Sequence, residues 1–162
     1  MSVTRLNHAV LYVRDAKKSA EFYMQVLDME EAASMRGAVF LKSRGTLNDH
    51  DLGLFSLGEN APMLPRGAAV GLYHLAWQVD TLGDLVEYEK RLREAGTFLG
   101  ATDHGLTKSV YGHDIDGIEF ELTWVVPSEL LNDGDNMKTV RLDINKEIER
   151  FGANTKSRDL SN

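Results

Sequence analysis

A pattern of apolar and polar residues that occurs twice is the feature that most constrains the fold of this 162-residue chain. Residues 5–13 are apolar with β-branched side chains, which predicts a buried strand. Asp15 then caps a predicted helix at residues 16–27, whose apolar side chains recur at helical spacing. Three shorter strands are expected at residues 31–35, 38–42 and 50–57. The first half therefore has the order β-α-β-β-β.

The second half restarts this order after a loop predicted at residues 58–67. A strand is predicted at residues 71–79, and Thr81 caps the next helix, with Asp84 in capping-box position. That helix runs to about residue 95. The remaining strands are expected at residues 98–102, 109–113 and 119–126. When the halves are superposed, the residues that coincide are His8 with His74, Val13 with Val79 and Phe22 with Tyr88.

Each unit covers only one face of its sheet with a helix, so two units must pair to enclose their open faces in a cleft. We therefore expect an α+β fold in which two paired βαβββ modules form a curved sheet around a cleft. The domain is expected at residues 1–127, with module one at about 4–58 and module two at about 70–127. Residues 128–162 form a C-terminal extension.

The extension is polar, but Ile144, Ile148 and Phe151 have helical spacing and predict a short helix at about residues 143–151. Two interpretations stay open. The extension is an arm that packs on the domain or on a second subunit, or it is a partly ordered tail.

Composition excludes several classes of function. The chain has 18 Lys and Arg against 25 Asp and Glu, a net charge of −7, which argues against a nucleic-acid binder and against docking on an anionic membrane. No apolar run approaches the roughly 20 residues of a membrane span, and the first residues lead directly into a strand pattern, so we expect a cytoplasmic protein without a signal peptide. The absence of cysteine leaves histidine and carboxylate side chains as the available metal ligands.

Strand parity places two histidines and a carboxylate on comparable faces. His8 and His74 occupy the same position in the repeated first strands, and Glu119 and Glu121 lie on the polar face of the last strand. Two histidines and one carboxylate bind a divalent metal and leave one side of it open. A single such residue is more often structural, whereas their joint placement favours a metal site in the cleft.

Residues 114–122 read Asp-Ile-Asp-Gly-Ile-Glu-Phe-Glu-Leu. This segment, together with the repeated units, resembles the vicinal oxygen chelate superfamily, which includes glyoxalases, bleomycin-resistance proteins and dioxygenases and commonly closes with Asp-Pro-x-Gly-x-x-x-Glu-Leu. Ile115 stands where the proline is usual. The resemblance covers residues 4 to about 127 and implies Glu121, rather than Glu119, as the carboxylate ligand. The implied metal ligands are His8, His74 and Glu121.

Within that superfamily, residues 102–111 resemble the His-Gly-Leu-Thr…Tyr segment of catechol 2,3-dioxygenases, the type I extradiol enzymes. Tyr111 precedes Glu121 by ten residues, as the active-site tyrosine does in that family, although the interval from His104 to Tyr111 is about two residues shorter. His50 matches the family's acid–base histidine at the start of a strand. Many of these enzymes have two such two-module domains, and this chain corresponds to the catalytic one.

The resemblance implies a dioxygenase that takes a catechol and O2 as substrates. Fe(II), with Mn(II) also suited to the ligands, would be the cofactor, and the product would be a ring-opened hydroxymuconic semialdehyde type. His50 would act as acid and base, Tyr111 would hydrogen-bond a catecholate oxygen, and His104 would hydrogen-bond Tyr111 or the substrate. We also expect a homodimer or higher homo-oligomer.

Three alternatives remain open. A thiol transferase to fosfomycin shares the same three ligands, and a bleomycin-resistance-type binding protein needs no metal. The third alternative is a glyoxalase. It is disfavoured, because glyoxalase I takes a fourth ligand from the end of the first module, where residues 53–55 of this chain offer none.

Overall fold

The computed structural model describes residues 2–3, 5–63 and 70–159. Part of the loop expected at residues 58–67 lies outside these ranges. The chain forms two compact units. Unit 1 comprises Met1–Val70 with the turn Asp114–Gly117, and unit 2 comprises Gly71–His113 with Ile118–Asn162. Within the described ranges, no helix is both long enough and apolar enough to cross a membrane.

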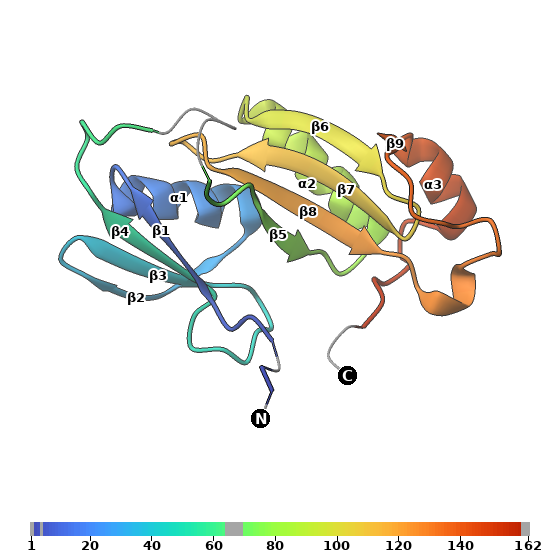
Figure 1. Ribbon diagram of the computed structural model, residues 1–162, viewed down its shortest axis with the longest axis horizontal. Coiled ribbons are helices and arrows are strands. Elements are labelled where there is room, and N and C mark those ends of the chain that lie inside the picture. Colours follow the sequence, from blue (N-terminus) through green and yellow to red (C-terminus); the bar gives the residue numbers. More distant parts are fainter. Residues whose placement is uncertain (1, 4, 64–69, 160–162) are drawn as a thin grey trace. The chain divides into compact units, whose positions relative to one another are not determined.

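Unit 1 is a four-stranded sheet with one helix (Figure 1). Its elements are β1 (Ala9–Val13), α1 (Ala16–Leu27), β2 (Glu30–Met35), β3 (Ala38–Lys42) and β4 (Leu52–Ser56). The strand order is β1-β4-β3-β2, with β1 parallel to β4 and the other pairs antiparallel. The Asp15 side chain accepts hydrogen bonds from the backbone N–H groups of Lys17 and Lys18, so α1 begins where its cap predicts.

The turn Asp114–Gly117 belongs to unit 1 through two of its aspartates. The Tyr23 hydroxyl donates to Asp114 Oδ2 at 3.1 Å. Arg14 donates to Asp116 from its backbone N–H at 2.8 Å and from Nη1 at 2.7 Å. Burial, reinforced by the Asp114 charge, raises the pKa of Tyr23 well above its usual value. The aspartates of the closing motif therefore connect this turn to Tyr23 of α1 and to Arg14.

Unit 2 repeats the connections of unit 1 in a five-stranded sheet. Its first elements are β5 (Leu75–Gln78), α2 (Leu82–Glu94), β6 (Phe98–Asp103), β7 (Thr107–His113) and β8 (Glu119–Val125). The strand order is β5-β8-β7-β6-β9, and β5 is parallel to β8, as β1 is to β4. The capping box predicted from Thr81 and Asp84 is present at the start of α2. The core between α2 and the sheet includes the fully buried Trp124.

These two sheets confirm the α+β class and the repeated β-α-β-β-β order. The first strand of each unit is shorter than predicted, because β1 begins at Ala9 and β5 at Leu75. The ladder shows where the strands start: Ala9 lies opposite Leu52 and Leu75 opposite Phe120, and among the described residues no earlier residue of either predicted strand is paired.

The extension is an ordered arm on unit 2, and we call its described residues 128–159 the C-terminal arm. It contains the short 3-10 helix η1 (Ser128–Leu130), β9 (Val140–Arg141) and α3 (Ile144–Phe151). The two residues of β9 pair with Thr102 and Asp103 of β6, an edge strand that sequence periodicity did not predict. Trp124 Nε1 donates to the Thr155 carbonyl at 3.0 Å, which ties the end of the arm to the core of unit 2.

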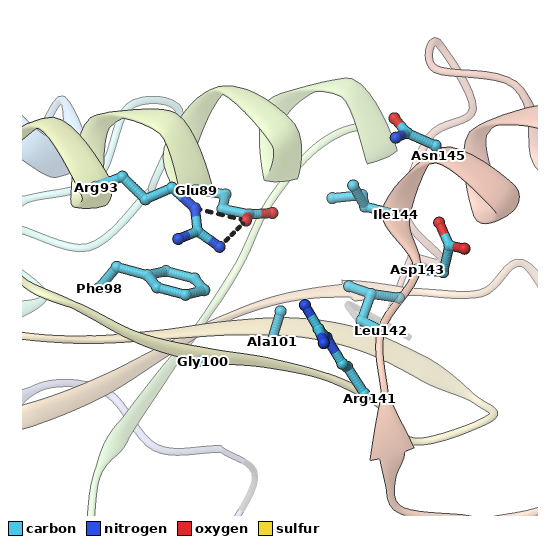
Figure 2. A pocket seen from close by; sticks show the side chains of 10 residues that line it. All are labelled: Glu89, Arg93, Phe98, Gly100, Ala101, Arg141, Leu142, Asp143, Ile144 and Asn145. Atoms are coloured by element: carbon cyan, nitrogen blue, oxygen red, sulfur yellow. Dashed lines mark hydrogen bonds and ion pairs between the residues drawn. The ribbon is translucent and has the colours of Figure 1, made fainter.

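A cavity of about 660 Å³ lies between α2, β6 and the C-terminal arm (Figure 2). Arg93 lies along one side of it, paired with Glu89 at 2.7 and 2.9 Å and stacked over the ring of Phe98 at 3.7 Å. The cavity is on the side of the sheet that α2 covers, whereas the polar residues of β8 face the other side.

Candidate metal centre

His74 and Glu121 meet on the open face of the unit 2 sheet. His74 lies immediately before β5, and Glu121 is on β8 opposite Ala76 in the parallel ladder. His74 Nε2 and Glu121 Oε2 are 3.0 Å apart, and the two side chains are only 24% and 13% exposed. The strand parity that predicted these two residues to share a face therefore agrees with their positions.

The donor atoms of this pair suit a metal ion. A nitrogen lone pair cannot face a carboxylate oxygen without a proton or a cation between them. The 3.0 Å separation is that of a hydrogen bond from a protonated Nε2 to the carboxylate, and a divalent ion would take the place of that proton. His74 Nδ1 is buried and has no hydrogen-bond partner among the described residues, so the polar contact of this ring is the one through Nε2.

Tyr111 and His104 extend the polar group on the same sheet. Tyr111 on β7 lies directly opposite Glu121 on β8, and its hydroxyl is 2.8 Å from His104 Nε2 in the turn between β6 and β7. Burial, followed by the charge of Glu121 and a hydrogen bond to it, raises the pKa of Tyr111 to about 12. The phenol therefore keeps its proton at neutral pH, and its hydroxyl hydrogen-bonds Glu121 and lies within hydrogen-bond distance of His104.

Unit 1 brings His8 and His50 together. His8 lies immediately before β1, and its ring centroid is 4.6 Å from that of His50, which lies just before β4. The edge of the His50 ring packs against Phe40 at 5.1 Å between centroids. His50 Nδ1 is 3.3 Å from Asp49 Oδ1, and its side chain is 19% exposed. His50 thus lies beside a carboxylate, whereas His8 lies beside a side-chain amide.

That amide belongs to Asn7, a residue that sequence reasoning missed. Asn7 Oδ1 is 2.8 Å from His8 Nδ1, and because this oxygen only accepts hydrogen bonds, the contact favours the neutral tautomer with the proton on Nδ1 and a lone pair on Nε2. Asn48 fixes Asn7 by donating from Nδ2 to the Asn7 carbonyl at 3.0 Å. The one sequence signal for this role is that Asn7 directly precedes the candidate ligand His8.

The repeat shows why unit 1 has no carboxylate of its own at the corresponding place. Gly53 pairs with Val10 in unit 1 as Glu121 pairs with Ala76 in unit 2. Phe40 lies opposite Gly53 as Tyr111 lies opposite Glu121. Where unit 2 has a carboxylate and a phenol, unit 1 has a glycine and a phenyl ring, so this register position offers no fourth ligand.

Within the described residues, no three His, Asp or Glu side chains are grouped so that they could hold a metal. Unit 2 supplies His74 and Glu121 together with Tyr111 and His104, and unit 1 supplies His8 and His50.

Comparison with known families decides what kind of chain this is. The model of the glyoxalase/bleomycin resistance protein/dioxygenase superfamily matches residues 5–122. The chain belongs to this superfamily. The superfamily resemblance of the repeated units and the closing motif is therefore confirmed.

Similar curated members of the superfamily are dioxygenases. A biphenyl-2,3-diol 1,2-dioxygenase of Rhodococcus globerulus is 31% identical over 117 residues, which is 71% of this chain and 60% of that protein. A catechol-2,3-dioxygenase of Bacillus subtilis is 29% identical over 74% of this chain and 41% of its own length. This chain thus spans between about two fifths and three fifths of these two relatives.

Solved structures of proteins with different names share the fold of this chain. A glyoxylase/bleomycin resistance protein/dioxygenase domain from Frankia sp. EAN1pec aligns with a TM-score of 0.60 at 25% identity, over 77% of this chain and all of that one. A fosfomycin resistance protein, FosX, from Listeria monocytogenes, in complex with Mn(II) and dihydroxypropylphosphonic acid, aligns with a TM-score of 0.56 at 22% identity, over 75% of this chain and 90% of that one. The second likeness concerns the fold alone.

Proposed function

We propose that this superfamily member is an extradiol dioxygenase that depends on a divalent metal, Fe(II) or Mn(II). It would cleave a catechol ring next to the diol and add both atoms of O2 to give a hydroxymuconic semialdehyde-type product. The observation that carries the proposal is the 3.0 Å contact between His74 and Glu121 with Tyr111 and His104 beside it. The dioxygenase names of the similar curated relatives support the same reading.

The proposed metal ligands are His8, His74 and Glu121. The Nε2 lone pair of His8 and the facing donor atoms of His74 and Glu121 suit such an ion. When bound, a divalent ion would supply Lewis-acid activation of the diol and of O2. Two neutral imidazoles and one carboxylate leave that site with a net positive charge, which favours a deprotonated diol.

The other polar side chains have roles that follow from their protons. Tyr111 holds its proton at neutral pH and can donate a hydrogen bond to a catecholate oxygen. His104 fixes the direction of the Tyr111 hydroxyl from the other side. His50 would accept the proton that the diol loses and return it to the product, the task of a general base that later acts as an acid.

Ring cleavage by the intact chain tests the proposal. Protein purified without oxygen is analysed for metal, reconstituted with Fe(II) or Mn(II), and mixed with catechol or 2,3-dihydroxybiphenyl. We expect one O2 to be consumed per diol, with a yellow ring-opened product. Metal-loaded protein that consumes no O2 with either diol contradicts the proposal.

The same preparation separates the alternatives. Stoichiometric metal together with thiol addition to fosfomycin, and no O2 uptake, indicates a transferase. Protein that binds no divalent metal, and binds an apolar ligand equally well with His74 or Glu121 replaced, indicates a binding protein.

A further inference from the structure

The C-terminal arm packs against the turn that carries His104. The backbone N–H of Lys138 donates to the His104 carbonyl at 3.2 Å, and Lys138 Nζ pairs with Asp103 Oδ2 at 2.6 Å. One arm residue therefore binds the backbone of His104 and the side chain of its neighbour.

The third residue of the turn touches the arm directly. Gly105 has a φ of +81°, a conformation that favours glycine, and a Cβ at this position would overlap the carbonyl oxygen of Asn136. Because no side chain separates the two backbones, the arm rests on the turn itself. Each of the residues Asp103, His104 and Gly105 thus has a contact with the arm.

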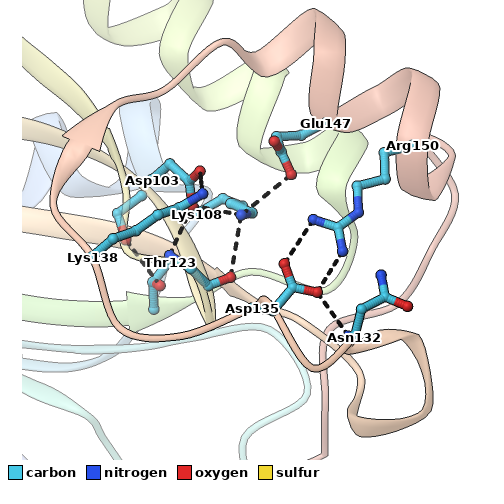
Figure 3. A network of polar contacts seen from close by, with 10 residues as sticks. Asp103, Lys108, Thr123, Asn132, Asp135, Lys138, Glu147 and Arg150 are labelled. Atoms are coloured by element: carbon cyan, nitrogen blue, oxygen red, sulfur yellow. Dashed lines mark hydrogen bonds and ion pairs between the residues drawn. The ribbon is translucent and has the colours of Figure 1, made fainter.

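A buried lysine joins this turn to helix α3 (Figure 3). Lys108 has no exposed surface, and its Nζ lies 2.5 Å from Asp103 Oδ1, 3.2 Å from the Gly105 carbonyl and 3.2 Å from Glu147 Oε2 on α3. A buried ammonium is costly to desolvate, and removal of one partner leaves the charge uncompensated. Lys108 is on the α2 side of the sheet, so it takes no part in the chemistry proposed for the open face.

The charges of this cluster balance. Burial raises the pKa of Asp103, but hydrogen bonds from Lys108, Lys138 and the Gly105 N–H outweigh it, so the pKa lies below its usual value. Asp103 and Glu147 thus face Lys108 and Lys138 as two acids and two bases. These ion pairs connect the turn to α3.

We propose that the C-terminal arm is a positioning element for His104, acting through Lys138 and through the Lys108–Glu147 pair. Its contacts hold the turn so that His104 Nε2 stays within 2.8 Å of the Tyr111 hydroxyl. The arm, His104 and Tyr111 all belong to unit 2. The consequence of this positioning for turnover rests on the proposed dioxygenase function.

The test replaces Lys138, whose side chain is 43% exposed, so that folding is preserved. Full-length, metal-free protein with isotope-labelled histidine is compared by NMR as wild type, Lys138→Met and Lys138→Arg, with His104 assigned by His104→Gln. We expect Lys138→Met to shift or broaden the His104 imidazole signals, leave those of His113 in place and be rescued by Lys138→Arg. Lys156→Met is the matched control, because Lys156 lies in the same arm and pairs with Asp80 at 3.6 Å, away from the turn.

Glu147→Gln provides a second variant that keeps the side-chain shape and removes its charge. His104 signals that are unchanged in both Lys138→Met and Glu147→Gln overturn the proposal. In metal-loaded enzyme, Lys138→Met should lower kcat about tenfold with little change in KM, since the substrate contacts stay. If wild-type protein cleaves no catechol, the proposed function fails, while the imidazole signals still decide whether the arm positions His104.

Discussion

At the residue scale, the roles proposed for His50 and Glu121, acid–base chemistry and metal binding, can be tested separately. His50 neighbours His8 at 4.6 Å between ring centroids, whereas Glu121 contacts His74 directly. We expect His50→Ala to keep stoichiometric metal and to lose roughly 10²-fold or more in kcat, the usual contribution of a positioned acid or base. Metal analysis and O2 uptake on the same preparation measure both effects.

Glu121→Gln is the counterpart of that variant. It should lose the metal and, with it, activity, because an amide is a weaker ligand than a carboxylate for Fe(II) or Mn(II). Wild-type turnover in His50→Ala, or full metal content in Glu121→Gln, would show that the role assigned to the replaced residue is wrong.

The sequence anticipated these side chains for different physical reasons. Alternation along strands is a local property, so it placed Glu121 on a polar face, and the repeat placed His74 at the edge of the same face. Asn7 escaped because its role depends on Asn48, which is distant in sequence and is brought close only by the fold. Contacts between separate loops leave no periodic signal in a single chain.

At the scale of elements, the ion pair between Asp135 and Arg150 anchors α3 to the loop before it. Arg150 Nη1 and Nη2 lie 2.9 and 2.5 Å from the two carboxylate oxygens. The Arg150 hydrogen bonds, with one from the Asn132 N–H, hold the pKa of Asp135 below its usual 3.8. The unfolded chain therefore takes up this proton at a higher pH than the folded chain does. The stabilisation is complete above about pH 4 and is lost as the pH falls through the lower pKa of the folded state.

Asp135→Asn should consequently lower the free energy of unfolding by about 1.5–3 kcal/mol at pH 7, the range for hydrogen bonds to a charged group. The difference from wild type should shrink as the pH falls below about 4. Urea unfolding at pH 7 and pH 3 measures it. Asp133→Asn is the control, because Asp133 is exposed and the structure describes no ion pair for it. An equal difference at both pH values would contradict the linkage to this carboxylate.

Elements with their own periodicity were predictable, and those that depend on a partner were not. Helix α1 has the predicted bounds because Asp15 caps it and its apolar stripe ends at Leu27. Strand β9 has only two residues and forms because it pairs with the edge of β6. Val140–Arg141 is therefore too short to show a strand pattern of its own. The Lys108 cluster was missed for the same reason: a lysine in a strand is normally solvated, and burial becomes acceptable only when Asp103 and Glu147 come from other elements.

At the scale of the whole molecule, the two units share the order of their elements but differ at two neighbouring register positions. Gly53 and Glu121 occupy equivalent places, as do Phe40 and Tyr111. A carboxylate therefore occupies the first of these register positions in unit 2 only, whereas a histidine precedes the first strand of each unit. A ligand set drawn from His8, His74 and Glu121 would therefore make metal binding a property of both units together.

That dependence gives a prediction for thermal unfolding. Mn(II) at about 100 times its Kd should stabilise the wild-type protein by about 2.7 kcal/mol, because it binds the folded state and not the unfolded one. His8→Ala and Glu121→Gln should each abolish most of this gain, although they lie in different units. His50→Ala should keep it, and a chelator should reverse it in the wild type. If His8→Ala retains the full Mn(II)-dependent rise in Tm while Glu121→Gln loses it, the ion is held by unit 2 alone and His8 is not a ligand.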